Sequence, residues 1–261
     1  MNLLAFDTST DVMSIAVCRT VDGRAWQWLH TGVGGAKAST GLIAGAMDLL
    51  AQAGLALTAL DAVCFGAGPG SFTGLRTACS VAQGLAFGAN LPVLPVDTLL
   101  AVAEEARFAS LATMPLLRVT AMLDARMEEM YVASYDYANG LWGALESSYL
   151  VRPEAFTVPA ATPFAAPGAL PVPASTAHCL AGNVFAVYGE RLATVAHLGL
   201  HCVTALPTAA AMLRLAPALL AAGKAVSAAD ALPAYIRDKV AKTTAERMAE
   251  KATQLASAAA Q

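Results

Sequence analysis

The side chains and backbone best suited to bind a charged ligand lie in a glycine-rich segment, Gly66 to Arg76, between an expected strand and an expected helix. A turn of this kind presents backbone N–H groups and the positive end of a helix to an anion such as phosphate. Its glycines fit neither the P-loop pattern, which ends in Gly-Lys-Ser/Thr, nor the dinucleotide pattern, which needs a third glycine. A tight turn with glycines at positive φ is the alternative interpretation. The candidate phosphate-binding residues of this segment are Gly68, Gly70, Ser71 and Thr73.

A second candidate for phosphate or metal contact is the acid that closes the first apolar run, Asp7, with the hydroxyls of Thr8 and Ser9 after it. Asp124 closes a similar run in the second half of the chain. An acid that caps the N–H groups of its own turn is the alternative for either residue taken alone. Their matched placement favours a nucleotide site.

A metal site or a catalytic triad is not expected. His197 and His201 are spaced as H-x-x-x-H, which on a helix would place both rings on one face as metal ligands. Gly199 lies between them, however, and the surrounding sequence predicts loop and strand. No Ser–His–Asp or Cys–His arrangement is recognisable, so we name no catalytic residue and no metal ligand.

The elements that must position these residues begin with three short apolar runs and then change to helical spacing. Alternating strands and helices follow. In order, the first half is expected to contain strands at 3–6, 13–18 and 25–30, a helix at 39–53, a strand at 61–66, a helix at 71–87, a strand at 93–96 and a helix at 98–109.

The second half opens in the same way, which indicates a duplicated α/β fold with two similar lobes. We expect the first lobe to span 1–100 with a returning helix near 208–222, which Pro217 should bend or break. The second lobe should span 101–207. Its expected elements are strands at 117–123, 129–135, 141–150 and 179–182, a helix at 184–193, a Pro/Ala-rich loop at 157–175 and, beyond the lobe, an Ala-rich tail at 241–261.

Composition points to a protein with a partner. Charged residues are only 13% of the chain and apolar residues are 57%, against roughly 25% charged in ordinary soluble domains. A chain so poor in charge favours a surface that another protein covers. Two long uncharged stretches, 77–96 and 155–189, contain polar residues and prolines that argue against membrane spans, and the N-terminus has no basic region typical of a signal peptide.

The cysteines and the net charge indicate in which compartment the protein works and whether it binds nucleic acid by itself. Five dispersed cysteines without a C-x-x-C pair indicate reduced thiols and a cytosolic protein. The net charge of −3 argues against a free-standing nucleic-acid binder. A local basic cluster is diluted by Asp238 and Glu246, and we interpret it as a solvated face. The cluster consists of Arg237, Lys239, Lys242 and Arg247.

Four segments together resemble the TsaB (YeaZ) family. They are residues 3–10, 68–76, 124–131 and 233–237, of which the Gly-Pro-Gly segment is the most specific. The resemblance runs from residue 3 to about 240. It implies an actin-like ATPase (ribonuclease H-like) fold and a non-catalytic subunit that works with TsaD and TsaE to place a threonylcarbamoyl group on N6 of adenosine 37 of tRNA.

The resemblance also implies a heterodimer with the catalytic paralogue TsaD and contact with tRNA through the complex. ATP or ADP is the candidate ligand at the complex interface, and a homodimer is the candidate state of the chain when TsaD is absent. TsaD carries a metal-binding H-x-x-x-H, and the corresponding region here, roughly 77–100, has no histidine. This favours a pseudoenzyme. The alternatives are a free-standing ATP-dependent phosphotransferase of the actin-like superfamily and a metallohydrolase that uses the two histidines.

The partner surface is predicted on the outward faces of the helices at 40–53 and 72–88. These faces carry small residues and one charge each, whereas a solvent face would carry several Lys and Glu. Small residues allow a second helix pair to approach closely. An Ala-rich surface without a partner is the alternative. The predicted interface residues are Gly41, Ala44, Gly45, Asp48, Gln52, Thr73, Arg76, Thr77, Ser80, Gln83 and Gly84.

Overall fold

The first lobe is built around β1 (Leu3–Asp7), a strand that is buried along its whole length. It pairs antiparallel with β2 (Val12–Val21), and β2 pairs antiparallel with β3 (Arg24–Val33). On its other side it pairs in parallel with β4 (Ala62–Gly68), which is followed by β5 (Val93–Asp97). The strand order is therefore β3-β2-β1-β4-β5. The computed structural model describes residues 1–34, 38–159, 177–192 and 199–237.

The side chains of β1 alternate between two helical layers. Leu4 and Phe6 pack against α1 (Ala38–Gln52) and α2 (Phe72–Ala89), whereas Leu3 and Ala5 pack against α6 (Ala209–Ala221). This alternation is the period of two that a strand imposes. A short 3-10 helix, η2 (Leu57–Ala59), precedes β4.

The second lobe repeats the arrangement around β6 (Leu116–Asp124). It pairs antiparallel with β7 (Met130–Ala138) and in parallel with β10 (Ala177–Gly182), which is followed by β11 (His201–Thr204). The order β11-β10-β6-β7-β8 mirrors the first sheet strand for strand. The expected actin-like (ribonuclease H-like) fold with two βββ openings is confirmed.

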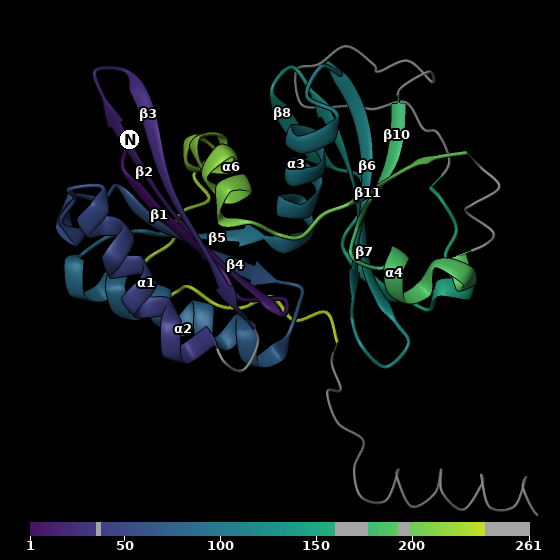
Figure 1. Ribbon diagram of the computed structural model, residues 1–261, viewed down its shortest axis with the longest axis horizontal. Coiled ribbons are helices and arrows are strands. Elements are labelled where there is room, and N and C mark those ends of the chain that lie inside the picture. The colour runs from purple at the N-terminus through teal and green to yellow at the C-terminus, as the bar shows by residue number, and fades with distance from the viewer. Residues whose placement is uncertain (35–37, 160–176, 193–198, 238–261) are drawn as a thin grey trace, which may run out of the picture.

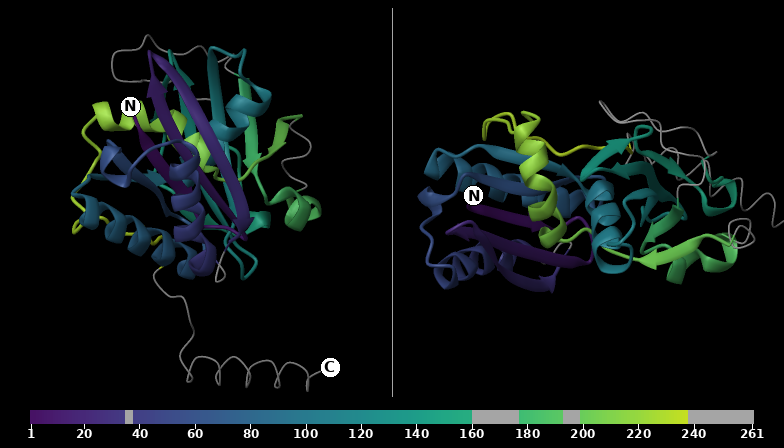
Figure 2. Two further views of the ribbon diagram at one scale, coloured as in Figure 1. Left: turned by 60° about the vertical axis from the view of Figure 1, so that its left-hand side comes forward. Right: turned by 90° about the horizontal axis from the view of Figure 1, so that it is seen from above.

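Two helices lie between the sheets. α3 (Thr98–Ser110) covers one face of the second sheet and also contacts α6, which covers the first sheet. Figures 1 and 2 show the lobes side by side with these helices between them. Because α6 packs on β1, β2 and β4, the chain returns to the first lobe after it has built the second.

Three expected elements differ in detail. The strand expected at 141–150 is two strands, β8 (Leu141–Ala144) and β9 (Tyr149–Val151), which pair with different parts of β7. Polar residues at 146–148 separate them.

The helix expected at 184–193 consists of α4 (Phe185–Tyr188) and the 3-10 turn η4 (Gly189–Leu192), and a further 3-10 turn, η3 (Pro153–Ala155), follows β9. α6 continues through Pro217, which is exposed. Met212, Leu215 and Ala216 are buried against the first sheet, and this packing holds the helix together across the proline.

Candidate functional site

The glycine-rich turn between β4 and α2 packs against the residues that follow β1. The N–H of Ser71 donates to the carbonyl of Ser9 at 2.7 Å, and the Ser71 hydroxyl caps α2 by accepting from the N–H of Gly74. Thr8 donates from its hydroxyl to the Gly74 carbonyl at 2.7 Å and is fully buried. These contacts tie the end of β1 to the first turn of α2.

The glycines of this turn provide space for other parts of the chain. A Cβ at Gly70 would lie 2.5 Å from the Ser9 Cβ, and one at Gly68 would collide with the carbonyl oxygen of Ala234. Gly68 has a φ of +127°, a conformation that favours glycine. The geometry therefore supports the plain interpretation of a tight turn, and one side of this turn is occupied by residue 234 of the same chain.

Asp7 faces the protein interior. Its Oδ1 accepts from the N–H and the hydroxyl of Ser9, at 3.0 and 2.7 Å. Its Oδ2 is buried against Gly66 and Met212 and has no hydrogen-bond partner among the described residues. Burial raises the pKa of this carboxyl from 3.8 to about 7. Asp7 is therefore neither exposed nor directed at the cleft between the lobes.

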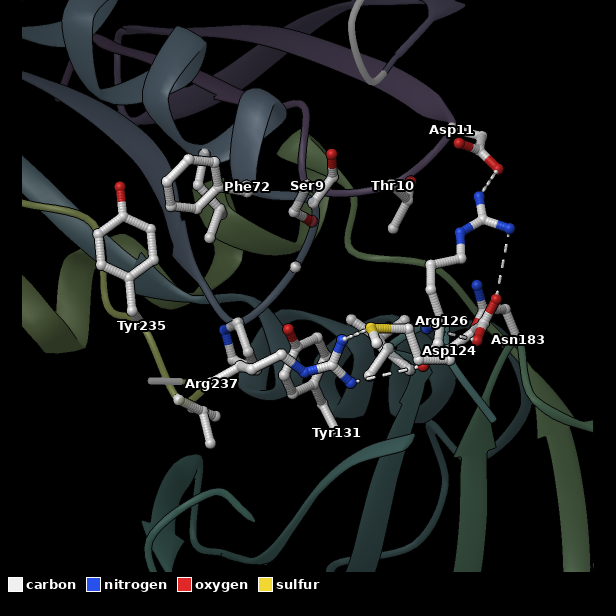
Figure 3. A pocket seen from close by; sticks show the side chains of 18 of the residues that line it. Ser9, Thr10, Asp11, Phe72, Asp124, Arg126, Tyr131, Asn183, Tyr235 and Arg237 are labelled. Carbon is white, nitrogen blue, oxygen red and sulfur yellow. Dashed lines mark hydrogen bonds and ion pairs between the residues drawn. The ribbon is translucent and has the colours of Figure 1, made fainter. Parts of the chain in front are cut away.

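A cavity of about 410 Å³ lies between the lobes (Figure 3). Of the predicted ligand-binding residues, the structure places Ser9, Gly70, Ser71 and Asp124 in its lining. The other four, Asp7, Thr8, Gly68 and Thr73, do not line it. Residues from the second lobe and from the segment after α6 complete the wall: Leu123, Arg126, Met127, Tyr131, Asn183, Tyr235 and Arg237.

Asp124, the counterpart of Asp7, is held by four polar contacts, one of which is an ion pair between its Oδ2 and the Arg126 guanidinium at 3.5 Å. Its Oδ1 accepts from the N–H of Arg126 at 2.9 Å and from the hydroxyl of Tyr188 at 2.8 Å. Its own N–H donates to the Asn183 side-chain oxygen at 2.9 Å. Burial and the hydrogen bond to Asp124 raise the pKa of Tyr188 to about 12. These contacts fit the alternative interpretation of Asp124, in which the carboxylate caps N–H groups of its own turn and does not bind a ligand.

The charged groups at the cavity pair with each other. Arg126 forms an ion pair with Asp11 of the first lobe at 2.6 Å (Figure 3), and Arg237 pairs with Glu129 of the second. Sequence reasoning did not assign Arg126 or Tyr235 to this site, and it placed Arg237 on a solvated face. All three residues lie inside segments that carry the family resemblance, 124–131 and 233–237, and this position could have indicated a role at the site.

The predicted partner surface is only partly as expected. On α2, Thr73, Arg76, Ser80 and Gly84 are exposed, and Thr77 and Gln83 are half-buried. On α1, Ala44, Asp48 and Gln52 are exposed. The contact of this surface with a partner stays a prediction.

The prediction was wrong for the two glycines of α1. A Cβ at Gly45 would lie 2.8 Å from Ile15 Cδ1, and one at Gly41 would lie 3.4 Å from the Met13 Cε. Both glycines face β2 and bring the helix close to the sheet. The outward face of α1 includes instead Ile43 and Met47, which are 50% and 44% exposed.

No group of histidine, cysteine, aspartate or glutamate that could hold a metal occurs within the described ranges. His201 begins β11 and is exposed, while His197 lies outside these ranges. Several other predicted features also lie outside the described ranges: the Pro/Ala-rich loop from residue 160, the tail at 241–261, Lys239, Lys242 and Arg247.

Within the part that the structure describes, no helix is both long and apolar enough to cross a membrane.

Known proteins match most of the chain. A family model described as "TsaD: tRNA N6-adenosine threonylcarbamoyltransferase" matches residues 38–251. Proteins called "tRNA threonylcarbamoyladenosine biosynthesis protein TsaB" from Escherichia coli and Haemophilus influenzae are 37% and 42% identical. The matches cover 59% and 50% of this chain, and 64% and 52% of those relatives, so the chain aligns with less than two thirds of their length.

A solved structure extends the similarity to the whole fold. YeaZ from Pseudomonas aeruginosa is 36% identical with a TM-score of 0.73 and covers 90% of this chain and 99% of its own. The resemblance to the TsaB (YeaZ) family expected from the sequence is therefore confirmed.

Proposed function

The chain belongs to the TsaD family, tRNA N6-adenosine threonylcarbamoyltransferase, and from its similarity to proteins named TsaB we propose that it is a non-catalytic subunit in the synthesis of threonylcarbamoyladenosine in tRNA. The observation that carries the proposal is the similarity to proteins that bear the name TsaB. In this proposal a TsaD paralogue supplies the catalytic residues and TsaE takes part as a third protein. A free-standing phosphotransferase is not favoured, since the curated relatives bear no such name.

Two features of the predicted ligand-binding residues support a non-catalytic role. The glycine turn, which is the part of the fold best suited to hold phosphate, is packed against Ser9 on one side and against Ala234 on another. The acid of the first lobe, Asp7, is buried and faces Gly66 away from the cavity. In this proposal the site is a structural remnant, and any ATP or ADP of the complex binds at the interface with the partner.

The partner surface in this proposal is the exposed face formed by α1 and α2. It combines small side chains, Ala44, Ser80 and Gly84, with the exposed apolar residues Ile43 and Met47. Asp48 and Arg76 are the charges that would orient a partner at its rim. A homodimer through the same face is the expected state when the TsaD paralogue is absent.

Reconstitution tests the proposal. The purified chain, a TsaD paralogue, TsaE, ATP, the threonylcarbamoyl donor and tRNA should give threonylcarbamoyladenosine, measured by mass spectrometry of the digested tRNA. Omission of this chain should abolish the product, and the chain alone should hydrolyse no ATP above background. Full product without the chain, or steady ATP turnover by the pure chain, would contradict the proposal.

A further inference from the structure

The segment that follows α6 crosses from the first lobe to the second at residues 231–237, which we call the strap (Figures 1 and 3). Its first half is bound to the first lobe. The carbonyl of Ala231 accepts from the Cys79 thiol at 3.3 Å and from the Gln83 amide at 2.9 Å. The N–H of Ala234 donates to the carbonyl of Ala67, in β4, at 2.7 Å.

The second half of the strap changes lobes within three residues. The Tyr235 ring lies 5.2 Å from the ring of Phe72, at the start of α2, and its hydroxyl accepts from Nε of Arg76 at 3.1 Å. The next residue, Ile236, packs against the core of the second lobe. Arg237 then forms an ion pair with Glu129, and the arginine side chain is 15% exposed.

The hairpin loop that Arg237 contacts has a strained backbone. Three consecutive residues, Arg126, Met127 and Glu128, have φ values of +60°, +55° and +61°. Each such non-glycine residue costs about 1–3 kcal/mol and persists only where surrounding contacts hold it. Arg237 supplies contacts of this kind, with a nitrogen 3.1 Å from the Met127 sulfur and a donor 3.4 Å from the Arg126 carbonyl.

The lobes are also joined by Arg214 of α6, which donates to Glu104 and Glu105 of α3 at 2.8 and 2.5 Å, and by Tyr135 of β7, whose hydroxyl donates to Asp97 of β5 at 2.7 Å. None of these residues lines the cavity. The strap and the ion pair between Arg126 and Asp11 form a second connection at the cavity itself.

We propose that the strap is a latch in which Arg237 holds the strained 126–128 loop of the second lobe and fixes the distance between the two lobes. The cavity then keeps one width, and the chain behaves as a single rigid body. This inference rests on the contacts of residues 231–237 and stands independently of the proposed role in tRNA modification.

Spin labels on the two lobes test the latch. Cysteines introduced at Thr58 and Ser147, both exposed, carry the labels, and Cys202→Ser removes the exposed native thiol. Pulsed electron paramagnetic resonance should give one narrow distance distribution for this background. Arg237→Ala and, separately, the isosteric Glu129→Gln should broaden it.

A matched control and a rescue make the test specific. Arg19→Ala removes a hydrogen bond that lies within the first lobe, to the Ala53 carbonyl, and should leave the distribution narrow. The double variant in which the two charges are swapped, Arg237→Glu with Glu129→Arg, should restore the narrow distance distribution. Amide exchange at Ala234 and in the loop should accelerate about tenfold in the single variants, which corresponds to about 1.4 kcal/mol.

The proposal would be overturned if both single variants kept a narrow distance distribution and an unchanged rate of amide exchange. It would also be overturned if the single variants broadened the distribution and the exchanged pair failed to narrow it, because the ion pair would then not be the holding contact. Should Arg237→Ala fail to fold, Glu129→Gln keeps side-chain size and decides the outcome.

Discussion

At the scale of single residues, the buried carboxyl of Asp7 gives the most direct prediction. Its pKa is about 7 in the folded protein, against 3.8 as the ordinary value. Between these values the folded state keeps a proton that the unfolded state has lost, so the free energy of unfolding falls as pH rises. The slope contributed by this group is about 1.4 kcal/mol per pH unit.

We therefore expect Asp7→Asn to flatten the decline of stability between about pH 4 and pH 7. The substitution should matter least at pH 4 and stabilise the protein relative to the wild type at pH 8, where the wild-type carboxylate is buried and charged. Urea denaturation at a series of pH values measures this. Parallel curves for the two proteins would show that Asp7 titrates normally.

Gly68 provides the second residue-scale prediction. Gly68→Ala places a Cβ on a backbone with φ of +127° and against the Ala234 carbonyl. We expect a loss of stability of about 1–3 kcal/mol in chemical denaturation. Gly88→Ala is the matched control, since a Cβ there meets nothing within 4 Å and lies in α2, where alanine should stabilise by about 0.5–1 kcal/mol. Equal effects of the two changes would contradict the role assigned to Gly68.

At the scale of elements, α1 and α2 carry the prediction about the partner. Ala44→Arg and Ser80→Arg each place a long charged side chain on the exposed face of these helices. Both variants should fold normally and bind the TsaD paralogue at least tenfold more weakly, or about 1.4 kcal/mol, in a calorimetric titration. Gly45→Arg is unsuitable, because this glycine faces Ile15 of the sheet.

The control for this test lies on the opposite layer of the lobe. Ala218→Arg introduces the same side chain on an exposed position of α6, which packs on the other face of the first sheet. It should bind the paralogue like the wild type. If all three variants bind equally well, the interface is elsewhere on the molecule.

At the scale of the whole molecule, charge limits binding to nucleic acid. A net charge of −3 over 261 residues provides no strong positive field, so we expect the isolated chain to bind tRNA weakly and with strong dependence on salt. Fluorescence anisotropy with labelled tRNA at two salt concentrations measures this. Tight binding by the chain alone at physiological salt would contradict it.

The sequence by itself determined the two-lobed fold and the family. Apolar runs of period two and helical runs of period 3.6 depend on neighbouring residues only, so the strand around Leu4 and the buried face around Leu42 could be predicted. The motifs at 68–76, 124–131 and 233–237 were equally visible, because each is contiguous in the chain.

Only the tertiary structure decided how these motifs meet. Gly45 faces the sheet because α1 lies close above β2, and the helical wheel alone places this residue on the outer face. Asp7 turns inward and Ala234 packs against the glycine turn because α6 returns to the first lobe and leads residues 231–237 across the cleft. Several contacts of residues 231–237 with α2 join residues more than 150 positions apart, and their geometry depends on the packing of both lobes, which no local pattern encodes.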